Sequence, residues 1–459
     1  MFKLIQNEMI KIFSKVSTYI MLGILLVLLV GVSALMKISG TYSYSGYTYT
    51  EQDLQSELDY LNSSKLDGYE VQVAEYEYMM KSGREWNTDS WEFEALDEAF
   101  QNFQAPLSYQ RDGMTDEEAA AYQNNLDETI RVIESGDWNA YAQLRLDQIA
   151  AGTEEETVKE ARSFPYRYML DNQIEADAGD WREDAAMEAG TAKLQVAELD
   201  QQKAQGMYVS EESYEEAQNQ AAICEYRLEH GIENYIDEEG MTGSEYWNSF
   251  LQESMMITVV SVIMIVLAGG CVANEFANGP VKFLLVNPVP RSKIIISKYL
   301  TMLLLSLLMI LGVYVLAALI NLPFFGADFG VPYLTAANGE VTAGSGYLYA
   351  LKDYLLEGVS LVAMTTMAFM ISSMMRNSAL AIGIGVTALL GGSMVVAMLA
   401  QLGCDWGRYF LFANMNLSQA ASGNTVFPNQ SLGFSLGVLA VHMVIFLITA
   451  YDGFTRREV

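Results

Sequence analysis

The sequence has little of the chemistry on which most enzymes rely. Its 459 residues include two histidines and three cysteines, and no G-x-x-x-x-G-K-[ST] phosphate-binding loop. Two histidines argue against a histidine-rich metal site and a nucleophilic triad, and without the loop the chain has no recognisable site for splitting ATP. The cysteines, Cys224, Cys271 and Cys404, are too few for a disulfide framework. We therefore expect no enzyme activity, no catalytic or metal-binding residues and no cofactor in this chain.

Positive charge is scarce, and negative charge is concentrated in one part of the chain. Residues 41–250 carry 13 basic and 47 acidic residues, a net charge of −34, whereas the rest of the chain carries 13 basic and 10 acidic residues. The average composition therefore hides a strongly acidic soluble segment and a nearly neutral apolar one. Nucleic acid is not an expected partner of either segment.

Charge is absent from long apolar runs on both sides of the acidic segment. These runs are 16–36, 254–274, 299–327, 358–375, 377–404 and 431–451. Each supplies the roughly 20 residues with which a helix crosses a hydrocarbon core, where backbone groups must satisfy their own hydrogen bonds. The sequence predicts an all-α integral membrane protein with six transmembrane helices and a large, mainly helical extracytoplasmic domain between the first two. Five or seven spans are the alternatives.

Lysine and arginine gather on one side of these spans. If the N-terminus is in the cytoplasm, ten basic residues flank the inner side and only Lys37, Lys352 and Arg408 flank the outer side. Positive charge favours the cytoplasmic side. We expect a multi-pass protein of a bacterial cell membrane, with both termini in the cytoplasm and the acidic domain outside.

The expected domain order follows from these spans. It is a cytoplasmic interfacial helix (1–16) with Phe2, Ile5, Met9 and Ile12 on one face, a first transmembrane helix (17–38), the acidic extracytoplasmic domain (39–252) and five transmembrane helices (253–459). The last part holds a cytoplasmic loop at 275–298 and outer loops at 322–355 and 405–432. We expect a hairpin-like excursion in the first outer loop and a re-entrant or interfacial helix in the second.

Helix-start signals recur in the acidic domain. Thr115 to Glu118 and Thr153 to Glu156 match the capping box, and Ser210 before two glutamates is a weaker start. We expect four or five helices separated by glycine-containing turns. Two of these turns, SGDW (135–138) and AGDW (178–181), share a GDW triplet, which is either an internal repeat or a coincidence.

A short basic stretch separates the second and third apolar runs. Residues 274–300 read NEFANGPVKFLLVNPVPRSKIIISKYL. We expect a short apolar helix that begins at Gly279-Pro280 and stops at Pro288 or Pro290, with basic residues at its ends. Such a helix suits the docking of a soluble subunit. An ordinary positive-inside loop explains the same spacing.

This stretch resembles the cytoplasmic loop between the second and third spans of permease subunits of type 2 ATP-binding-cassette (ABC) exporters. The matching residues are Glu275, Gly279, Lys282, Leu284, Leu285, Pro288, Arg291, Ile294, Ser297 and Lys298. The N-terminal FKLIQNEMIKIF is similar to the interfacial helix that opens such permeases. The likeness covers the membrane part, about half of the chain, and departs from the family at Pro280, where threonine is usual.

The resemblance implies a permease subunit of a bacterial ABC exporter that forms the substrate pathway as a dimer with a second copy or a homologue. Separate ATPase subunits, carrying ATP and Mg, would dock on the loop, with Lys293 among the coupling residues, and lipid would surround the spans. The alternative is a non-transporting membrane receptor or assembly protein with a ligand-binding outer domain, whose spans would serve mainly as an anchor.

Glycines such as Gly269 and Gly385 indicate close helix packing, which a simple anchor does not need. The acidic domain either attracts a cationic peptide or simply keeps the protein dispersed.

Overall fold

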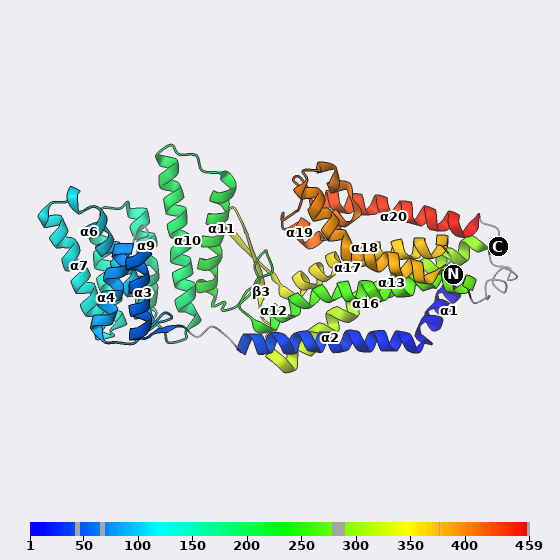
Figure 1. Ribbon diagram of the computed structural model, residues 1–459, viewed down its shortest axis with the longest axis horizontal. Coiled ribbons are helices and arrows are strands. Elements are labelled where there is room, and N and C mark those ends of the chain that lie inside the picture. The colour runs from blue at the N-terminus through cyan, green and yellow to red at the C-terminus, as the bar shows by residue number, and fades with distance from the viewer. Residues whose placement is uncertain (42–45, 65–68, 278–289, 376, 457–459) are drawn as a thin grey trace. The chain divides into compact units, whose positions relative to one another are not determined.

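The computed structural model describes residues 1–41, 46–64, 69–277, 290–375 and 377–456. The chain divides into two compact units, which Figure 1 shows in the colours of the sequence. The membrane unit comprises residues 1–42, 234–334 and 343–459, and the insert unit comprises residues 43–233 and 335–342.

Six helical segments among the described residues are long and apolar enough to cross a membrane, as predicted. They are α2 (Val16–Thr41), the run of α12 (Glu245–Gln252), η3 (Glu253–Met255), α13 (Met256–Cys271) and α14 (Ala273–Ala277), and then α16 (Arg291–Phe325), α17 (Gly346–Met375), α18 (Ser378–Gln401) and α20 (Leu432–Thr455). The short helix α1 (Phe2–Phe13) precedes them. The expectation of a mainly helical protein with six candidate membrane spans is confirmed.

Polar residues start several of these helices. Asn377 accepts a hydrogen bond from Leu380 N (3.2 Å) at the start of α18, and Ser431 accepts one from Phe434 N (3.2 Å) at the start of α20. Each side chain satisfies one of the backbone donors that a helix leaves unpaired in its first turn. The apolar runs thus begin as helices at residues that the sequence supplies locally.

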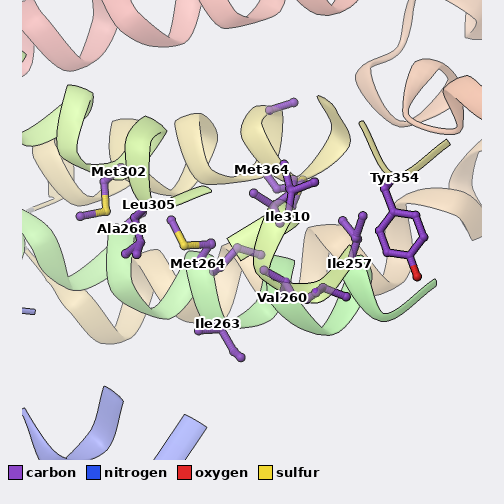
Figure 2. Packing of buried hydrophobic residues seen from close by; sticks show 14 of the residues in the cluster. Ile257, Val260, Ile263, Met264, Ala268, Met302, Leu305, Ile310, Tyr354 and Met364 are labelled. Atoms are coloured by element: carbon purple, nitrogen blue, oxygen red, sulfur yellow. The ribbon is translucent and has the colours of Figure 1, made fainter. Parts of the chain in front are cut away.

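Helices α13 and α17 form the centre of the membrane unit. In their most apolar windows 56% and 61% of the residues are buried, against 17% in α2, 17% in α18 and 11% in α20. Figure 2 shows Val260 and Met264 of α13 with Leu305 of α16 and Met364 of α17 in the shared core. Buried apolar contact between helices therefore fixes α13, α16 and α17, and the outer faces of α2, α18 and α20 stay apolar and exposed.

Two predicted glycine contacts are present. A Cβ at Gly269 would lie 2.9 Å from Ile382 Cγ1, and a Cβ at Gly385 would lie 2.6 Å from Ile265 Cγ2. Both glycines belong to the packing of α13 against α18, and any side chain there would force the two helices apart. The predicted close approach is confirmed at these two residues, whereas a Cβ at Gly383 or Gly391, which belong to the same predicted set, would meet no atom of the described residues within 4 Å.

The loop between α16 and α17 contains the expected hairpin. Strands β3 (Pro332–Ala337) and β4 (Glu340–Ser345) pair with each other, and Asn338 and Gly339 between them have φ values of 52° and 77°. Asn-Gly is the preferred pair for a two-residue turn in which both residues have positive φ. The sequence of this loop therefore determines its turn directly.

The segment between α18 and α20 differs from the prediction. In place of one interfacial helix it forms η4 (Asp405–Tyr409), η5 (Leu411–Asn414) and α19 (Leu417–Ala421). The Asn414 side chain donates to the carbonyl groups of Arg408 (2.7 Å) and Phe410 (2.9 Å), so it stabilises turns instead of a continuous helix.

The insert unit contains more helices than the four or five expected. Its described residues form β1 (Thr48–Tyr49), α3 (Glu51–Ser64), α4 (Tyr69–Ser82), β2 (Trp86–Asn87), α5 (Trp91–Ala99), η1 (Phe100–Gln104), α6 (Ala105–Tyr109), η2 (Arg111–Gly113), α7 (Asp116–Ser135), α8 (Trp138–Ala151), α9 (Glu156–Asp171), α10 (Trp181–Ala204) and α11 (Glu211–His230). Strands β1 and β2 are antiparallel. The estimate was too low because polar caps and glycines divide the acidic segment into short helices around one apolar core.

The first and larger segment of the insert unit ends at Glu233 and not at residue 252. Trp247 is fully buried in the membrane unit, where its Nε1 donates to the Asp328 carbonyl oxygen (2.6 Å), and Tyr354 Oη donates to the Phe250 carbonyl oxygen (2.7 Å). These aromatic contacts bind α12 to the membrane helices. The polar residues around them, such as Asn248, made the segment look like part of the acidic domain.

Candidate functional site

Four charged side chains from three helices meet beside the residues predicted to form the coupling loop. Lys298 of α16 is the most buried, with 1% of its side chain exposed, and its Nζ donates to Glu8 Oε2 (2.7 Å) and Glu275 Oε1 (2.7 Å). Its third contact is the Cys271 carbonyl oxygen at 3.4 Å, at the C-terminal end of α13. All three donors of the ammonium group are therefore used. The carbonyl end of a helix also attracts a cation.

Lys11 completes this group, which we call the charge cluster (Glu8, Lys11, Glu275 and Lys298). Its Nζ donates to Glu8 Oε1 (2.7 Å) and Glu275 Oε1 (3.0 Å), while half of its side chain stays exposed. Burial opposes ionisation of Glu8, but the neighbouring Lys298 and Lys11 hold the pKa of Glu8 below its ordinary value. Two cations and two carboxylates compensate each other, which makes their burial tolerable.

The bend between α13 and α14 positions Glu275. The helix is interrupted at Val272, and the N–H groups of Val272 and Ala273 donate to Ser372 Oγ of α17 at 3.3 and 3.0 Å. The hydroxyl satisfies backbone groups that the interrupted helix would otherwise leave buried and unpaired. Glu275 thereby reaches Lys298.

The predicted coupling residues fall into three groups. Gly279, Lys282, Leu284, Leu285 and Pro288 lie outside the described residues. Glu275 and Lys298 come together in the charge cluster. Arg291 and Lys293 belong to the first turn of α16, where Arg291 is half-buried and Lys293 is exposed.

The predicted apolar face of the N-terminal helix is divided between two surroundings. Ile12 is 9% exposed and belongs to the core of the membrane unit, and Met9 packs against the same core. Ile5 is half-buried, whereas Phe2 is 80% exposed. Helix α1 is therefore attached to the other helices at its C-terminal half, and Phe2 remains available for another apolar surface.

Sequence reasoning missed Glu8 and Ser372. The signal for Glu8 was present, because an acidic residue three positions before Lys11 in an otherwise basic, amphipathic helix is out of keeping with a purely interfacial role. Ser372 gave no such signal. A serine in an apolar span looks ordinary until the bend that it satisfies is known.

A buried carboxylate was also missed in the membrane unit. Glu253 is fully buried, and its Oε1 accepts hydrogen bonds from Ser33 Oγ (2.6 Å) and Asn321 Nδ2 (3.2 Å). Its Oε2 has no hydrogen-bond partner within the described part of the chain. An ionisable group held by three spans is costly, so it usually has a role beyond packing.

Comparisons with known proteins identify a family and two relatives from Bacillus subtilis (strain 168). The family described as "Protein of unknown function (DUF2705)" matches residues 218–459, which include Glu275 and Lys298. The uncharacterized protein YhcI of Bacillus subtilis (strain 168) is 35% identical over 245 residues, or 52% of this chain and 74% of the relative. The uncharacterized membrane protein YdbK of the same organism is 32% identical over 203 residues, or 44% and 78%. No solved structure matches this chain.

Proposed function

This chain belongs to the family described as "Protein of unknown function (DUF2705)", and we propose that it is the membrane-spanning permease subunit of an ATP-driven ABC exporter. Two such subunits, identical or homologous, would form the substrate pathway. Separate ATPase subunits would dock on residues 275–298 and would bind the ATP and Mg that drive transport. The proposal rests on the likeness of the loop to such permeases, and the charge cluster supplies its physical basis.

The charge cluster carries the proposal because it connects both ends of the loop to the N-terminal helix. Glu275 is the first residue of the loop and contacts Lys11 of α1, and Lys298 is its last residue and contacts Glu8 of α1. A force applied to the loop would therefore reach α1, α13 and α16 together. ATP-driven closure of two ATPase subunits would move two such loops, and each cluster would transmit that movement to its spans.

The proposed orientation follows from the end of the membrane unit at which the cluster lies. Glu275 contacts Lys11, and the rings of Phe276 and Phe454 are 6.1 Å apart, so the loop ends, α1 and the end of α20 share one end of this unit, as Figure 1 also shows. Basic residues gather at this end, which favours the cytoplasmic side. The insert unit would then be extracytoplasmic.

Purification of the tagged protein in a mild detergent from its native host tests the proposal. We expect an ABC ATPase to co-purify with the wild-type chain. The double variant Arg291→Glu with Lys293→Glu should lose it, because both residues lie in the proposed docking loop and reversal of their charge would repel a complementary acidic surface.

A matched control separates docking from net charge. The double variant Lys81→Glu with Lys352→Glu changes two exposed lysines elsewhere and alters the charge by the same amount. It should keep the ATPase. If the wild-type chain brings down no ATPase, the exporter proposal fails and a membrane receptor or assembly protein replaces it.

A further inference from the structure

Three helices of the insert unit begin in the same way. Trp91, Trp138 and Trp181 are the first residues of α5, α8 and α10, and each follows a polar residue whose side chain caps the helix. The caps are Ser90, which accepts from Phe93 N, Asp137, which accepts from Ala140 N, and Asp180, which accepts from Arg182 N. The GDW triplets of the sequence are two of these three starts. The triplets therefore mark a way of starting a helix, with a polar cap followed by tryptophan, that recurs in this unit.

A small residue follows each tryptophan by one turn. Ala95, Ala142 and Ala185 occupy the fourth position after the tryptophans and are 4%, 0% and 1% exposed. Residues four apart lie on the same face of a helix, so each tryptophan is followed on its own face by a buried methyl group. A larger residue at these positions would occupy the space beside the ring.

The three helix starts surround a cleft with a volume of about 810 Å³. The three tryptophans line it together with Tyr141 and Tyr166. This volume lies within the range of about 300–1,000 Å³ that is typical of small-molecule sites. The cleft is therefore large enough for an organic ligand or for side chains of a peptide.

Four of these five aromatic rings, all except that of Trp181, form one connected group. The ring centroids of Trp91 and Trp138 are 5.4 Å apart at 73°, those of Trp91 and Tyr141 are 5.4 Å apart, and those of Trp138 and Tyr166 are 6.1 Å apart. Trp138 is 8% exposed, and its Nε1–H lacks an acceptor among the described residues. A buried indole N–H usually has a partner, so this lining residue still has a hydrogen bond to donate.

Carboxylates surround this aromatic group. The acidic lining residues are Asp89, Glu94, Glu98, Asp177, Asp180, Glu183 and Asp184, and the described lining contains no lysine or arginine. Arg145 compensates Glu98, and Arg182 compensates Asp180. The other five carboxylates of the lining form no ion pair with a described basic residue. They differ in this respect from the carboxylates of the charge cluster.

The crowding of these carboxylates affects their ionisation. Desolvation raises the pKa of Glu94 above its ordinary value, and repulsion from the negative charges of Asp177 and Asp184 raises it further. Desolvation also raises the pKa of Glu183. A hydrogen bond from the backbone N–H of Asp177 opposes this rise, and the negative charges of Asp177 and Asp184 add to it. Mutual repulsion of this kind is relieved when a cation enters.

We propose that this cleft binds an organic cation with apolar surface, in the form of a substituted ammonium group that contacts the tryptophan rings and the carboxylates together. Aromatic faces attract such cations, and the carboxylates add Coulomb attraction. The group can belong to a small quaternary ammonium compound or to a lysine side chain of a peptide. The inference concerns the insert unit and stands independently of the exporter proposal.

Isothermal titration calorimetry on the purified full-length chain in dodecyl maltoside, a detergent without charge, tests this directly. One arm compares choline with its neutral carbon analogue 3,3-dimethyl-1-butanol. The other compares the peptide Ac-Lys-Leu-Lys-amide with the same peptide acetylated at both Nε atoms. In at least one arm we expect the charged member to bind about tenfold or more tightly than its neutral counterpart. The arm that responds identifies the source of the ammonium group.

Two variants locate the binding. Glu94→Gln with Asp184→Asn removes two exposed cleft carboxylates for which the structure shows no ion pair, and should weaken binding by about tenfold. Glu128→Gln with Glu216→Gln removes two exposed carboxylates outside the cleft and should stay within about twofold of the wild type.

Circular dichroism checks that both double variants are folded. Equal weakening in the two would show that net charge alone attracts the cation, which would overturn the proposal. Failure of the wild-type chain to distinguish either charged probe from its neutral analogue would overturn it without reference to any variant. The measurement requires neither ATP nor a docked ATPase, so its failure is distinguishable from failure of the exporter proposal.

Discussion

The charge cluster of the membrane unit and the cleft of the insert unit use the same residue types in opposite ways. In the cluster two lysines face two carboxylates, and the ammonium group of Lys298 has an acceptor for every proton. Seven carboxylates line the cleft, and only two of them, Glu98 and Asp180, are paired with an arginine, which in each case lies outside the lining. A compensated group holds helices together, whereas an uncompensated one leaves its attraction available to a ligand.

The largest expected effect comes from removing the centre of the compensated group. Lys298→Met would leave Glu8 and Glu275 with only the half-exposed Lys11, and loss of one partner from a buried ion group costs about 3–5 kcal/mol. We expect a marked fall in the unfolding temperature of the membrane unit in detergent. Lys293→Met, which removes an exposed lysine of the same helix, serves as the control and should leave that temperature nearly unchanged. Equal stability of the two variants would contradict the structural role of the cluster.

A second prediction concerns Glu75 of the insert unit, a buried carboxylate whose pKa is raised, whereas the pKa of Glu8 in the charge cluster is lowered. Burial, with a contribution from Asp97, raises the pKa of Glu75 to about 8, and Glu75 is 3% exposed. Since its pKa in the folded state exceeds the unfolded value, ionisation of Glu75 destabilises the folded chain. This penalty is complete above pH 8 and disappears as the pH falls toward the unfolded pKa.

Glu75→Gln should therefore stabilise the insert unit in alkaline solution by a few kcal/mol relative to the wild type. The gain should shrink on going from pH 9 to pH 5. Thermal unfolding of both proteins at these two pH values measures it. A difference that does not change with pH would show that Glu75 is not ionised by pH 9 or is compensated by another group.

The smallest expected effect tests the exposed member of the cluster. Lys11 has 51% of its side chain exposed, so solvent screens its attraction to Glu8 and Glu275. Lys11→Met should cost less than about 1 kcal/mol. A loss as large as that of Lys298→Met would mean that the four charges act as one unit, which a double variant would reveal as non-additivity.

Two capping-box matches show where local sequence is sufficient and where it fails. Thr115 and Glu118 form the complete reciprocal box at the start of α7, because nothing else competes for either side chain. At the second match α9 begins at Glu156 with Glu155 as its cap, and no side chain satisfies the first turn. Glu154 is instead paired with Arg162 at 3.3 Å. The prediction at Thr153 was wrong because α9 starts two residues later than the box requires, so Glu156 is its first helical residue instead of its third. Ser210, the weaker signal, does cap α11.

The candidate site was predictable only in part. The basic residues and prolines of 274–300 pointed to Glu275 and Lys298, since both belong to the same short loop in the sequence. Their partner Glu8 is 290 positions away from Lys298, so its contact depends on how α1 packs against α16. The same holds for the cleft, where the GDW triplets were visible but the start at Trp91 shares only the tryptophan and the cap.

The sequence alone determined which segments are apolar helices, where the acidic insert lies, and which turn joins β3 to β4. Uncharged runs in a membrane protein permit few structures other than helices, and Asn-Gly permits few turns. Tertiary structure decided which charges are compensated. Coulomb attraction acts between groups that packing brings within a few ångströms, so the pairing of Lys298 with Glu8 and the crowding of carboxylates around three tryptophans exist only once the helices have assembled.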